Sequence, residues 1–367
     1  MYEKNRMNNT TLIHPKKTIL FTIFVLFFSF SVFLAWGASA LNFFTNVSGI
    51  DLSPGQRFIN LLYLFGFGYY VLPIATISAL EIIIHGYKNS SLENIIKNKN
   101  GSQRDIFFLL FFILISKSET AEAVVTIGIS SFRNYFYEIS TLTLASLEMR
   151  LTDITTSIPL LLFLSSIIYD FAMYIQHRIA HELRLLWAVH RVHHSAEEMT
   201  LLNWGRDTVF GNFLQGLIIV IPVALISDLG ITEDGNLQKT DLIGLGCFII
   251  FSMFISFNRF MSHSNLQSNW GWIGRYIVVS PAAHRIHHSV LEKHFNKNYG
   301  SNLIIWDHMF GTYYDPDLDS EICPIGIKNN PYNKGNFLYN YIIRPIADVC
   351  YELKKLIYWL FSLVLNK

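Results

Sequence analysis

The sequence predicts an all-α fold: an integral membrane helical bundle that carries a histidine-rich metal cap on its cytoplasmic face. Hydrophobic residues make up 51% of the 367 residues, charged residues only 15%, and the mean hydropathy is +0.33. Soluble globular chains are rarely this apolar. Long apolar runs alternate with short polar stretches, and nine of the 13 histidines fall between residues 177 and 288. The apolar runs predict the bundle, and the histidines predict the cap.

Charge and cysteine content narrow the classes of function. A formal net charge of +1 gives no reason to expect a nucleic-acid partner, because basic surfaces that bind nucleic acid stand out as an excess of positive charge. Cys247, Cys323 and Cys350 lie far apart and form no CxxC pair, which argues against a disulfide framework or a thiolate metal site. Any metal must therefore be bound by nitrogen or oxygen atoms.

The N-terminal region, residues 1–150, is predicted to span or anchor in the membrane. Residues 18–36 form an uncharged apolar run preceded by four basic residues, which places the N-terminus in the cytoplasm; a cleaved signal peptide is the alternative. The apolar stretch 58–84 should cross back, and 85–104 reads as a cytoplasmic loop. Residues 105–155 contain charges within apolar sequence and are expected only to be helical and membrane-associated.

The central region, residues 151–317, is predicted to be the catalytic domain. Apolar runs at 156–176, 208–230 and 241–258 are read as an incoming helix and a returning hairpin. This topology puts 177–207 and 259–317 on one side of the membrane. Both segments are rich in arginine and lysine, which identifies that side as cytoplasmic. Residues 318–367, ending in the short apolar run LIYWLFSLVL, are expected to form a C-terminal interfacial tail.

Three histidine motifs and one isolated histidine carry the chemistry. Residues at i, i+3 and i+4 project from one helix face, so HxxxH and HxxHH can aim two or three imidazoles at one centre. A single HxxxH pair is more often an ordinary interfacial pair, but three such motifs on one membrane face indicate metal binding. Nine rings are too many for one tetrahedral ion, so two ions are implied, and iron, zinc and copper all suit a nitrogen donor set. The nine rings are those of the isolated His263 and of the eight motif histidines His177, His181, His190, His193, His194, His284, His287 and His288.

Two residues preceding the first motif extend its stripe along the same helix face. Asp170 and Tyr174 stand seven and three residues before His177. A carboxylate or a phenol in such a position can hold a ligand imidazole in one tautomer. We therefore expect both side chains to contact the metal ligands on the side away from the metal and to fix their tautomers.

The motifs and their surroundings resemble the fatty acid hydroxylase and sterol desaturase superfamily. The resemblance rests on YDFAMYIQHRIAHELRLLWAVHRVHHSAEEM, NWGRD, SPAAHRIHHS and NYGSNLIIWDHMFGTYY, and it covers roughly residues 155–317. It implies a membrane-bound non-haem oxygenase in which two iron ions use O2 and two external electrons to oxidise a C–H bond of a lipid.

The resemblance also implies roles for individual positions. The eight histidines of the three motifs match the family's ligands, His263 stands where the family often adds another, and Asn265 is a weaker candidate. Asn298, Arg206 and Asp307 follow the family pattern with supporting roles. His294 and His308 fall at variable positions, and His14 and His85 lie outside the matched region, so these four are left out of the ligand set.

An arginine follows the first histidine of each motif, at Arg178, Arg191 and Arg285. Neighbouring residues do not share a helix face, so these side chains must point away from the ligands. Contact with lipid headgroups, pairing with acidic residues such as Glu182, Glu197 and Glu198, and simple extension toward the membrane interface all remain open.

Three classes of function follow from these observations. A lipid hydroxylase acting on a fatty acyl, sterol-like or ether lipid is favoured, and a lipid desaturase using the same site is the main alternative. A metal transporter is a distant third, because its ligands should lie at the midplane of broken helices. The sequence contains no dinucleotide fingerprint and no CxxCH haem motif, so an external donor, a reductase with a ferredoxin or cytochrome b5 type carrier, is expected.

Overall fold

The computed structural model describes residues 72–108, 158–206, 257–319 and 322–365. These residues are mainly helical, and no β-strand occurs among them; two isolated bridges pair Val278 with Leu303 and Ser289 with Ile325. The prediction of an all-α fold agrees with this architecture. The predicted apolar spans 18–36 and 208–230 lie outside the described residues, as do nearly all of 105–155 and 241–258.

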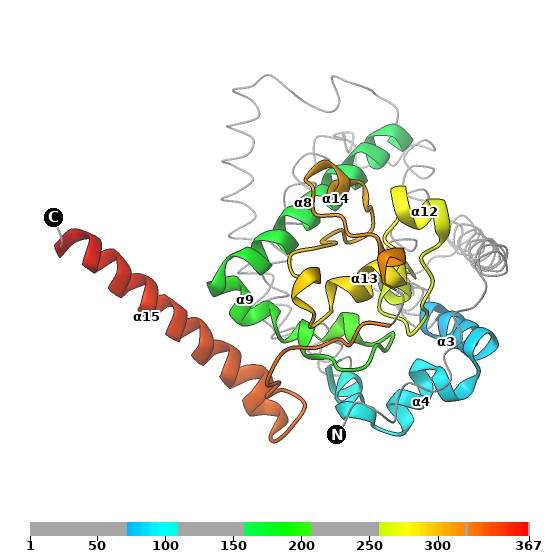
Figure 1. The fold of residues 1–367 in the computed structure, drawn as a ribbon, viewed down its shortest axis with the longest axis horizontal. Helices are drawn as coiled ribbons and strands as arrows, with labels where there is room; N and C mark the ends of the chain where they lie inside the picture. The colour runs from blue at the N-terminus through cyan, green and yellow to red at the C-terminus, as the bar shows by residue number, and fades with distance from the viewer. Residues whose placement is uncertain (1–71, 109–157, 207–256, 320–321, 366–367) are drawn as a thin grey trace, which may run out of the picture.

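Two consecutive helices, α8 (Ile158–Glu182) and α9 (Arg184–His190), begin the described part of the central region (Figure 1). Leu183, in an extended conformation at φ −93° and ψ 116°, separates the two helices. Helix α8 contains the predicted span 156–176 almost entirely and continues through the HxxxH motif. Within the described part of the chain, no helix is both long and apolar enough to cross a membrane.

Residues 85–104 are more ordered than the predicted loop. Helix α3 (Leu72–His85) leads through the 3-10 turn η2 (Tyr87–Asn89) into helix α4 (Ser91–Ile96), and the turn η3 (Lys99–Gly101) follows. Ser90 caps α4, since its hydroxyl accepts a hydrogen bond from the Glu93 backbone N–H at 3.2 Å. Serine followed three residues later by glutamate is the capping-box pattern. The expectation of a simple loop was wrong here because that local signal outweighs the polar composition.

The second half of the central region consists of short helices joined by ordered turns. Residues 257–262 are helical, and they are followed by α12 (Gly271–Tyr276), α13 (Pro281–His287) and α14 (Ile305–Met309). Ser280 begins α13 as an N-cap, accepting from the Ala283 N–H at 3.1 Å, and Pro281 occupies the first helical position. The remaining short turns are η4 (His193–Ser195), η5 (Asn203–Gly205), η6 (Glu292–His294) and η7 (Pro316–Leu318).

An apolar cluster joins the N-terminal segment to the histidine-bearing segments. Ile77 and Leu80 of α3 pack with Leu201, Phe260 and Met261, all less than 8% exposed. Burial of aliphatic and aromatic side chains of this size stabilises a fold by about 1.5–3 kcal/mol each. The cluster thus fixes α3 against the residues that lead to His263.

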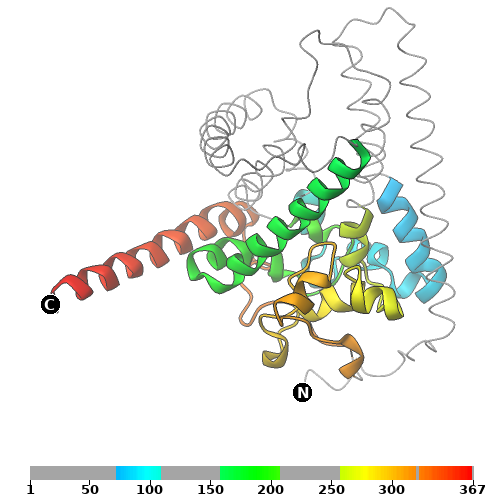
Figure 2. The same ribbon diagram turned by 90° about the horizontal axis from the view of Figure 1, so that it is seen from above.

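One long helix forms most of the last described segment. A π-helical turn η8 (Tyr339–Ile343) runs directly into α15 (Arg344–Leu365). Helix α15 starts beside α9, where Arg191 forms an ion pair with Asp348, and then projects away from the rest of the molecule (Figures 1 and 2). Three of its apolar residues, Ile346, Ile357 and Phe361, are at least half exposed.

Candidate metal centre

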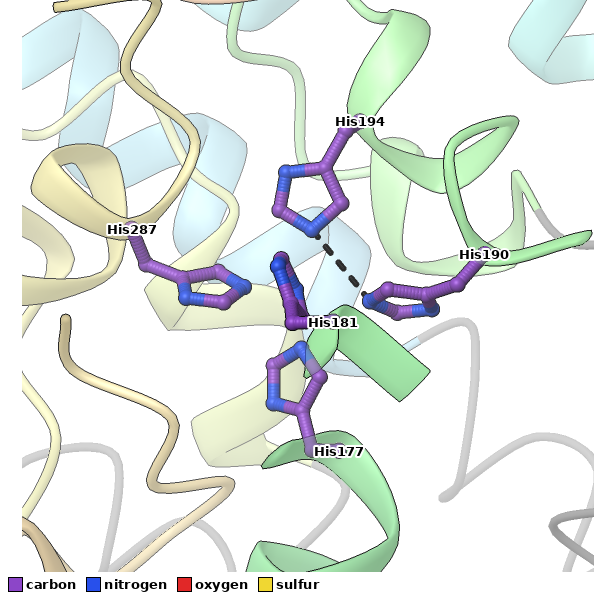
Figure 3. A group of neighbouring side chains, drawn as sticks. All are labelled: His177, His181, His190, His194 and His287. Atoms are coloured by element: carbon purple, nitrogen blue, oxygen red, sulfur yellow. Dashed lines mark hydrogen bonds between the residues drawn. The ribbon is translucent and has the colours of Figure 1, made fainter. Parts of the chain in front are cut away.

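The nine predicted histidine ligands come together in two adjoining groups. The five-histidine group consists of His177, His181, His190, His194 and His287, and the four-histidine group consists of His193, His263, His284 and His288. Within each group, one ring nitrogen from every member lies within 4.8 Å of all the others. The five rings of the larger group point toward a common centre (Figure 3). The groups adjoin, because the rings of His194 and His288 stack at 4.3 Å with an interplanar angle of 25°.

The two HxxHH motifs divide their histidines between the groups in opposite ways. In the motif at 190–194, the rings at i and i+4 belong to the five-histidine group and the ring at i+3 to the four-histidine group. In the motif at 284–288 the rings at i and i+4 belong to the four-histidine group, and His287 at i+3 belongs to the five-histidine group. The two HxxHH motifs therefore each contribute to both candidate ions.

The spacing of nitrogens in the four-histidine group fits one bound ion. The Nε2 atom of His263 lies 3.2 Å from that of His193 and 2.9 Å from that of His284, and the His284 and His288 Nε2 atoms are 3.1 Å apart. Two nitrogens bound to the same ion at about 2.0–2.1 Å, with an angle between 90° and tetrahedral, are separated by about 2.8–3.4 Å. The observed separations fall in that range.

Unpartnered nitrogens in the five-histidine group also fit a metal. The Nε2 atoms of His177, His181 and His287 are buried and have no hydrogen-bond partner among the described residues. The Nε2 atoms of His190 and His194 lie 3.2 Å apart. Since a buried polar atom without a partner costs free energy, three such atoms around one point indicate a missing ligand that all three can bind.

Backbone carbonyl groups fix the tautomers of three rings. The Nδ1 atom of His177 lies 2.8 Å from the Tyr299 carbonyl oxygen, and that of His287 lies 3.0 Å from the Lys297 carbonyl oxygen. In the four-histidine group, His263 Nδ1 lies 2.8 Å from the Arg259 carbonyl oxygen. A carbonyl can only accept, so each Nδ1 carries the proton and each Nε2 presents its lone pair.

Burial keeps these imidazoles neutral. Eight of the nine rings are at most 9% exposed; His181 is intermediate, although its Nε2 atom is buried. Burial lowers the pKa of His177 and of His263 to about 4. Burial, followed by repulsion from neighbouring rings, also lowers the pKa of His181 and His284 well below the ordinary value. Neutral imidazole is the form that binds metal, so the site is prepared for a cation at neutral pH.

Asp170 and Tyr174, expected behind the ligands of the first motif, make their hydrogen bonds elsewhere. The Asp170 carboxylate accepts from the Asn302 side chain, the Leu303 N–H and the Trp306 indole at 2.8–3.1 Å. The Tyr174 hydroxyl lies 3.0 Å from the Thr312 hydroxyl. Neither contacts a histidine ring through a hydrogen bond among the described residues. The helical stripe was read correctly, but its polar atoms hold the 302–312 segment against α8.

Asn265 and Asn298, the other two supporting candidates, also bond to groups other than the rings. Asn265 accepts from Arg285 Nη2 at 2.8 Å and donates to the Asn89 carbonyl at 2.7 Å. Asn298 donates to the Ala283 and Tyr314 carbonyls and accepts from the Tyr314 N–H. Both asparagines join segments that carry candidate ligands.

The histidines left out of the ligand set lie apart from the two groups. His294 pairs with Asp319 at 2.7 Å, and the ring of His308 stacks on Tyr313 at 4.0 Å. His85 ends helix α3, and His14 lies outside the described residues. Cys323 and Cys350 are free thiols and Cys247 lies outside the described residues, so the described sulfur atoms join neither group.

The three arginines that follow a histidine have distinct partners. Arg178 pairs with Glu182 at 2.7 Å, as one of the sequence alternatives proposed. Arg191 pairs with Asp348 of α15, and Arg285 binds the Asn265 side chain. Arg191 and Arg285 therefore connect the histidine segments to other parts of the chain, whereas the pair of Arg178 lies within α8.

One buried network was missed by the sequence analysis. Arg206 and Asp105, 1% and 0% exposed, form an ion pair at 2.6 Å, and Arg206 also donates to the Ser195 hydroxyl at 3.2 Å. Ser195 directly follows His194 in the chain. Arg206 stood in the NWGRD motif, but the charge of Asp105 lay in a segment assigned to the membrane, so nothing in the sequence connected the two.

A helical protein with two adjoining all-histidine groups belongs to the class of candidate two-metal proteins. Residues 162–312 match the family model described as fatty acid hydroxylase. The matched segment contains all nine candidate ligands, and the match agrees with the family resemblance of the sequence motifs.

The chain is similar to three characterised kinds of lipid enzyme. It is 30% identical over 157 residues to ornithine lipid hydroxylase OlsE of Rhizobium tropici, covering 43% of each chain. It is 35% identical over 153 residues to alkylglycerol monooxygenase of Danio rerio, covering 42% of this chain and 30% of that protein. A fatty acid hydroxylase, vlmA of a Lecanicillium species, is 27% identical over 183 residues, 47% of this chain and 44% of that one. The chain thus spans less than half the length of these relatives, and no solved structure matches it.

Proposed function

We propose that this protein is a membrane-bound oxidoreductase that hydroxylates an unactivated C–H bond of a lipid with O2. The observation that carries the proposal is the pair of adjoining histidine groups, whose rings are neutral and converge on two centres. We further propose that each group holds one iron ion. The nitrogen-only donor set suits iron by ligand type, and the family match favours it over zinc or copper.

The two ions would supply the reductive activation of O2, which no side chain of the protein can perform. The histidines would hold the two ions, and because neutral imidazole carries no negative charge it would not offset their positive charge. Carbonyl groups behind His177, His263 and His287 keep the Nε2 lone pairs directed inward. Burial of the rings excludes water from the centre, which protects an oxidising site from side reactions.

The substrate is proposed to be a membrane lipid with a long apolar chain. The relatives are named for ornithine lipids, alkylglycerols and fatty acids, which share an acyl or alkyl chain and differ in headgroup. Oxidation of the lipid with O2 requires two further electrons. We propose an external reductase with a ferredoxin or cytochrome b5 type carrier as their source.

We propose the same placement in the membrane that the sequence predicts. Residues 1–150 would anchor the chain, 151–317 would form the catalytic domain, and the histidine groups would face the cytoplasm. Helix α15, with exposed Ile346, Ile357 and Phe361, would lie along the membrane surface as the interfacial tail.

Lipid analysis of cells with and without the protein, grown in oxygen, tests the function. A hydroxylase should produce a lipid heavier by one oxygen atom, and the purified protein should contain about two iron ions per chain. Replacing His193 or His287 by alanine, one residue from each group, should remove metal and abolish the oxygen-dependent product.

Other outcomes of this experiment would identify the alternatives. A product lighter by two hydrogen atoms would make the protein a desaturase. Metal uptake without any oxygen-dependent product would favour a transporter. Full turnover in either histidine variant would contradict the site assignment.

A further inference from the structure

We propose that Asp307 and Asn298 are positioning residues for the five-histidine group alone. They act through the carbonyl loop, defined as residues 296–300, whose backbone orients two of the five rings. The inference rests on the part of the proposed function that assigns one metal ion to each histidine group.

The carbonyl loop contacts two rings of the same group. The Lys297 carbonyl accepts from His287 Nδ1, and the Tyr299 carbonyl accepts from His177 Nδ1. The opposite nitrogens of these two rings are buried and unpartnered at the centre of the group. One short stretch of backbone therefore sets the direction of ligands that come from α8 and α13, more than 100 residues apart in the chain.

The loop has an unusual backbone that needs support. Asn296 and Asn298 are both left-handed, with φ of 61° and 55°, and they stand on either side of Lys297. Asparagine tolerates this region better than most residues, but the conformation still costs free energy and persists only when surrounding contacts hold it. Two side chains provide those contacts.

Asp307 is the first support. Its carboxylate accepts from the backbone N–H groups of Tyr299 and Gly300, both at 2.8 Å, and from the Thr312 hydroxyl at 2.6 Å. The side chain is fully buried. Gly300 is packed so closely that an added Cβ would lie 2.9 Å from an Asp307 carboxylate oxygen. The carboxylate thus holds the peptide group that contains the Tyr299 carbonyl, through the Gly300 N–H, and the peptide group before it, through the Tyr299 N–H.

Asn298 is the second support. Its amide donates to the Ala283 carbonyl at 3.1 Å and the Tyr314 carbonyl at 3.0 Å, and its oxygen accepts from the Tyr314 N–H at 2.8 Å. These contacts tie the residue between Lys297 and Tyr299 to α13, the helix that carries His287. The loop is therefore fixed relative to one of the ligands that it orients.

The four-histidine group has a different support. The Nδ1 atom of His263 bonds to the Arg259 carbonyl, four residues earlier in its own helical segment. Among the described hydrogen bonds, the carbonyl loop contacts no ring of that group. Loosening the loop should therefore weaken metal binding by the five-histidine group and leave metal binding by the four-histidine group unchanged.

The test measures iron(II) affinity of the purified full chain, by competition with a coloured chelator, for each group separately. The double variant His263→Ala/His284→Ala disables the four-histidine group, and His181→Ala/His190→Ala disables the five-histidine group. Asp307→Asn is placed in both backgrounds. Asn carries one acceptor oxygen in place of two, so it cannot accept from both backbone N–H groups and the hydroxyl in the same geometry.

In the His263→Ala/His284→Ala background, we expect Asp307→Asn to weaken iron(II) binding about 10- to 100-fold, the usual effect of removing an outer partner of a ligand. In the His181→Ala/His190→Ala background, the iron(II) affinity should be unchanged. Asn298→Gly, which keeps the left-handed backbone and removes only the side-chain contacts, should act in the same direction and serves as the test if Asp307→Asn does not fold.

Glu81→Gln is the matched control. The Glu81 carboxylate also accepts from two backbone N–H groups and one hydroxyl, but these belong to Ser91 and Asn265. This variant should leave the five-histidine ion at its original affinity.

Two results would overturn the inference while leaving the proposed function intact: unchanged affinity of Asp307→Asn and Asn298→Gly in the first background, or equal losses in both backgrounds. A wild-type chain that binds no iron(II) would overturn the proposed metal centre and this inference together.

Discussion

The two histidine groups are built from the same motifs but differ in how their nitrogens are held. In the four-histidine group, three Nε2 contacts of 2.9–3.2 Å connect every ring to another. In the five-histidine group only His190 and His194 are in such contact, and three Nε2 atoms have no partner. The Nε2 atoms of the four-histidine group lie close together, whereas the rings of the five-histidine group depend on the carbonyl groups that orient them.

The difference teaches that a histidine motif does not correspond to one group. Because the i+3 ring in each HxxHH motif leaves the group of its two neighbours, the two groups share their scaffold. Damage to the shared scaffold should affect both groups, whereas removal of a ring or its support should affect one.

The largest expected effect comes from breaking the shared scaffold at Arg206. Arg206→Met would leave the buried Asp105 carboxylate without its ion-pair partner and Ser195 without a donor. Breaking a buried pair in this way costs about 3–5 kcal/mol, which denaturant unfolding in detergent would measure. Since Ser195 follows one ligand of each group, both ions should be lost. Loss of a single ion, with stability unchanged, would contradict a shared scaffold.

A smaller and selective effect should follow from removing one ring from each group. His284→Ala leaves three rings in the smaller group, whereas His181→Ala leaves four in the larger. We expect iron(II) affinity to fall further in His284→Ala, by about tenfold or more relative to His181→Ala, which corresponds to about 1.4 kcal/mol. Chelator competition on both variants measures this. Equal losses would mean that the number of rings does not limit binding.

The smallest effect is expected at the surface. Glu292 and Lys328 form an ion pair at 2.8 Å with side chains 78% and 67% exposed. Exposed pairs of this kind contribute about 0–1 kcal/mol, so Glu292→Gln should leave unfolding and the iron content of both groups nearly unchanged. A clear loss of iron in this variant would show that surface charge, and not the buried supports, separates the two groups.

The sequence identified the rings of the candidate site but not their arrangement. Helical spacing within three motifs predicted that eight histidines would share a site, and the family resemblance added His263; the structure brings these nine together. The division into five and four could not be predicted, because it depends on how α9, η4 and α13 are oriented toward α8. The groups that orient the rings could not be predicted either, because the Lys297 and Tyr299 carbonyls are backbone groups, which every residue has.

Long-range contacts explain the remaining differences. Asp170 lies on the predicted stripe, but its partners Asn302 and Trp306 follow more than 130 residues later. Nothing local in the sequence reveals them. For the fold, the helical class was predictable from apolar runs, and α4 was predictable from the Ser90 and Glu93 capping pattern. The length of α15 was not predicted, because only the apolar run LIYWLFSLVL near its end was singled out.

The opposite division of the two HxxHH motifs also constrains how the chain can vary. One added residue turns everything after it by about 100° around a helix axis. An insertion between His284 and His287 would therefore redirect both later rings, and each ion would lose a ligand. The two residues inside each motif, Arg191 with Val192 and Arg285 with Ile286, can change in kind only as far as packing and the contacts of the two arginines allow. Their number is fixed by the geometry of both histidine groups at once.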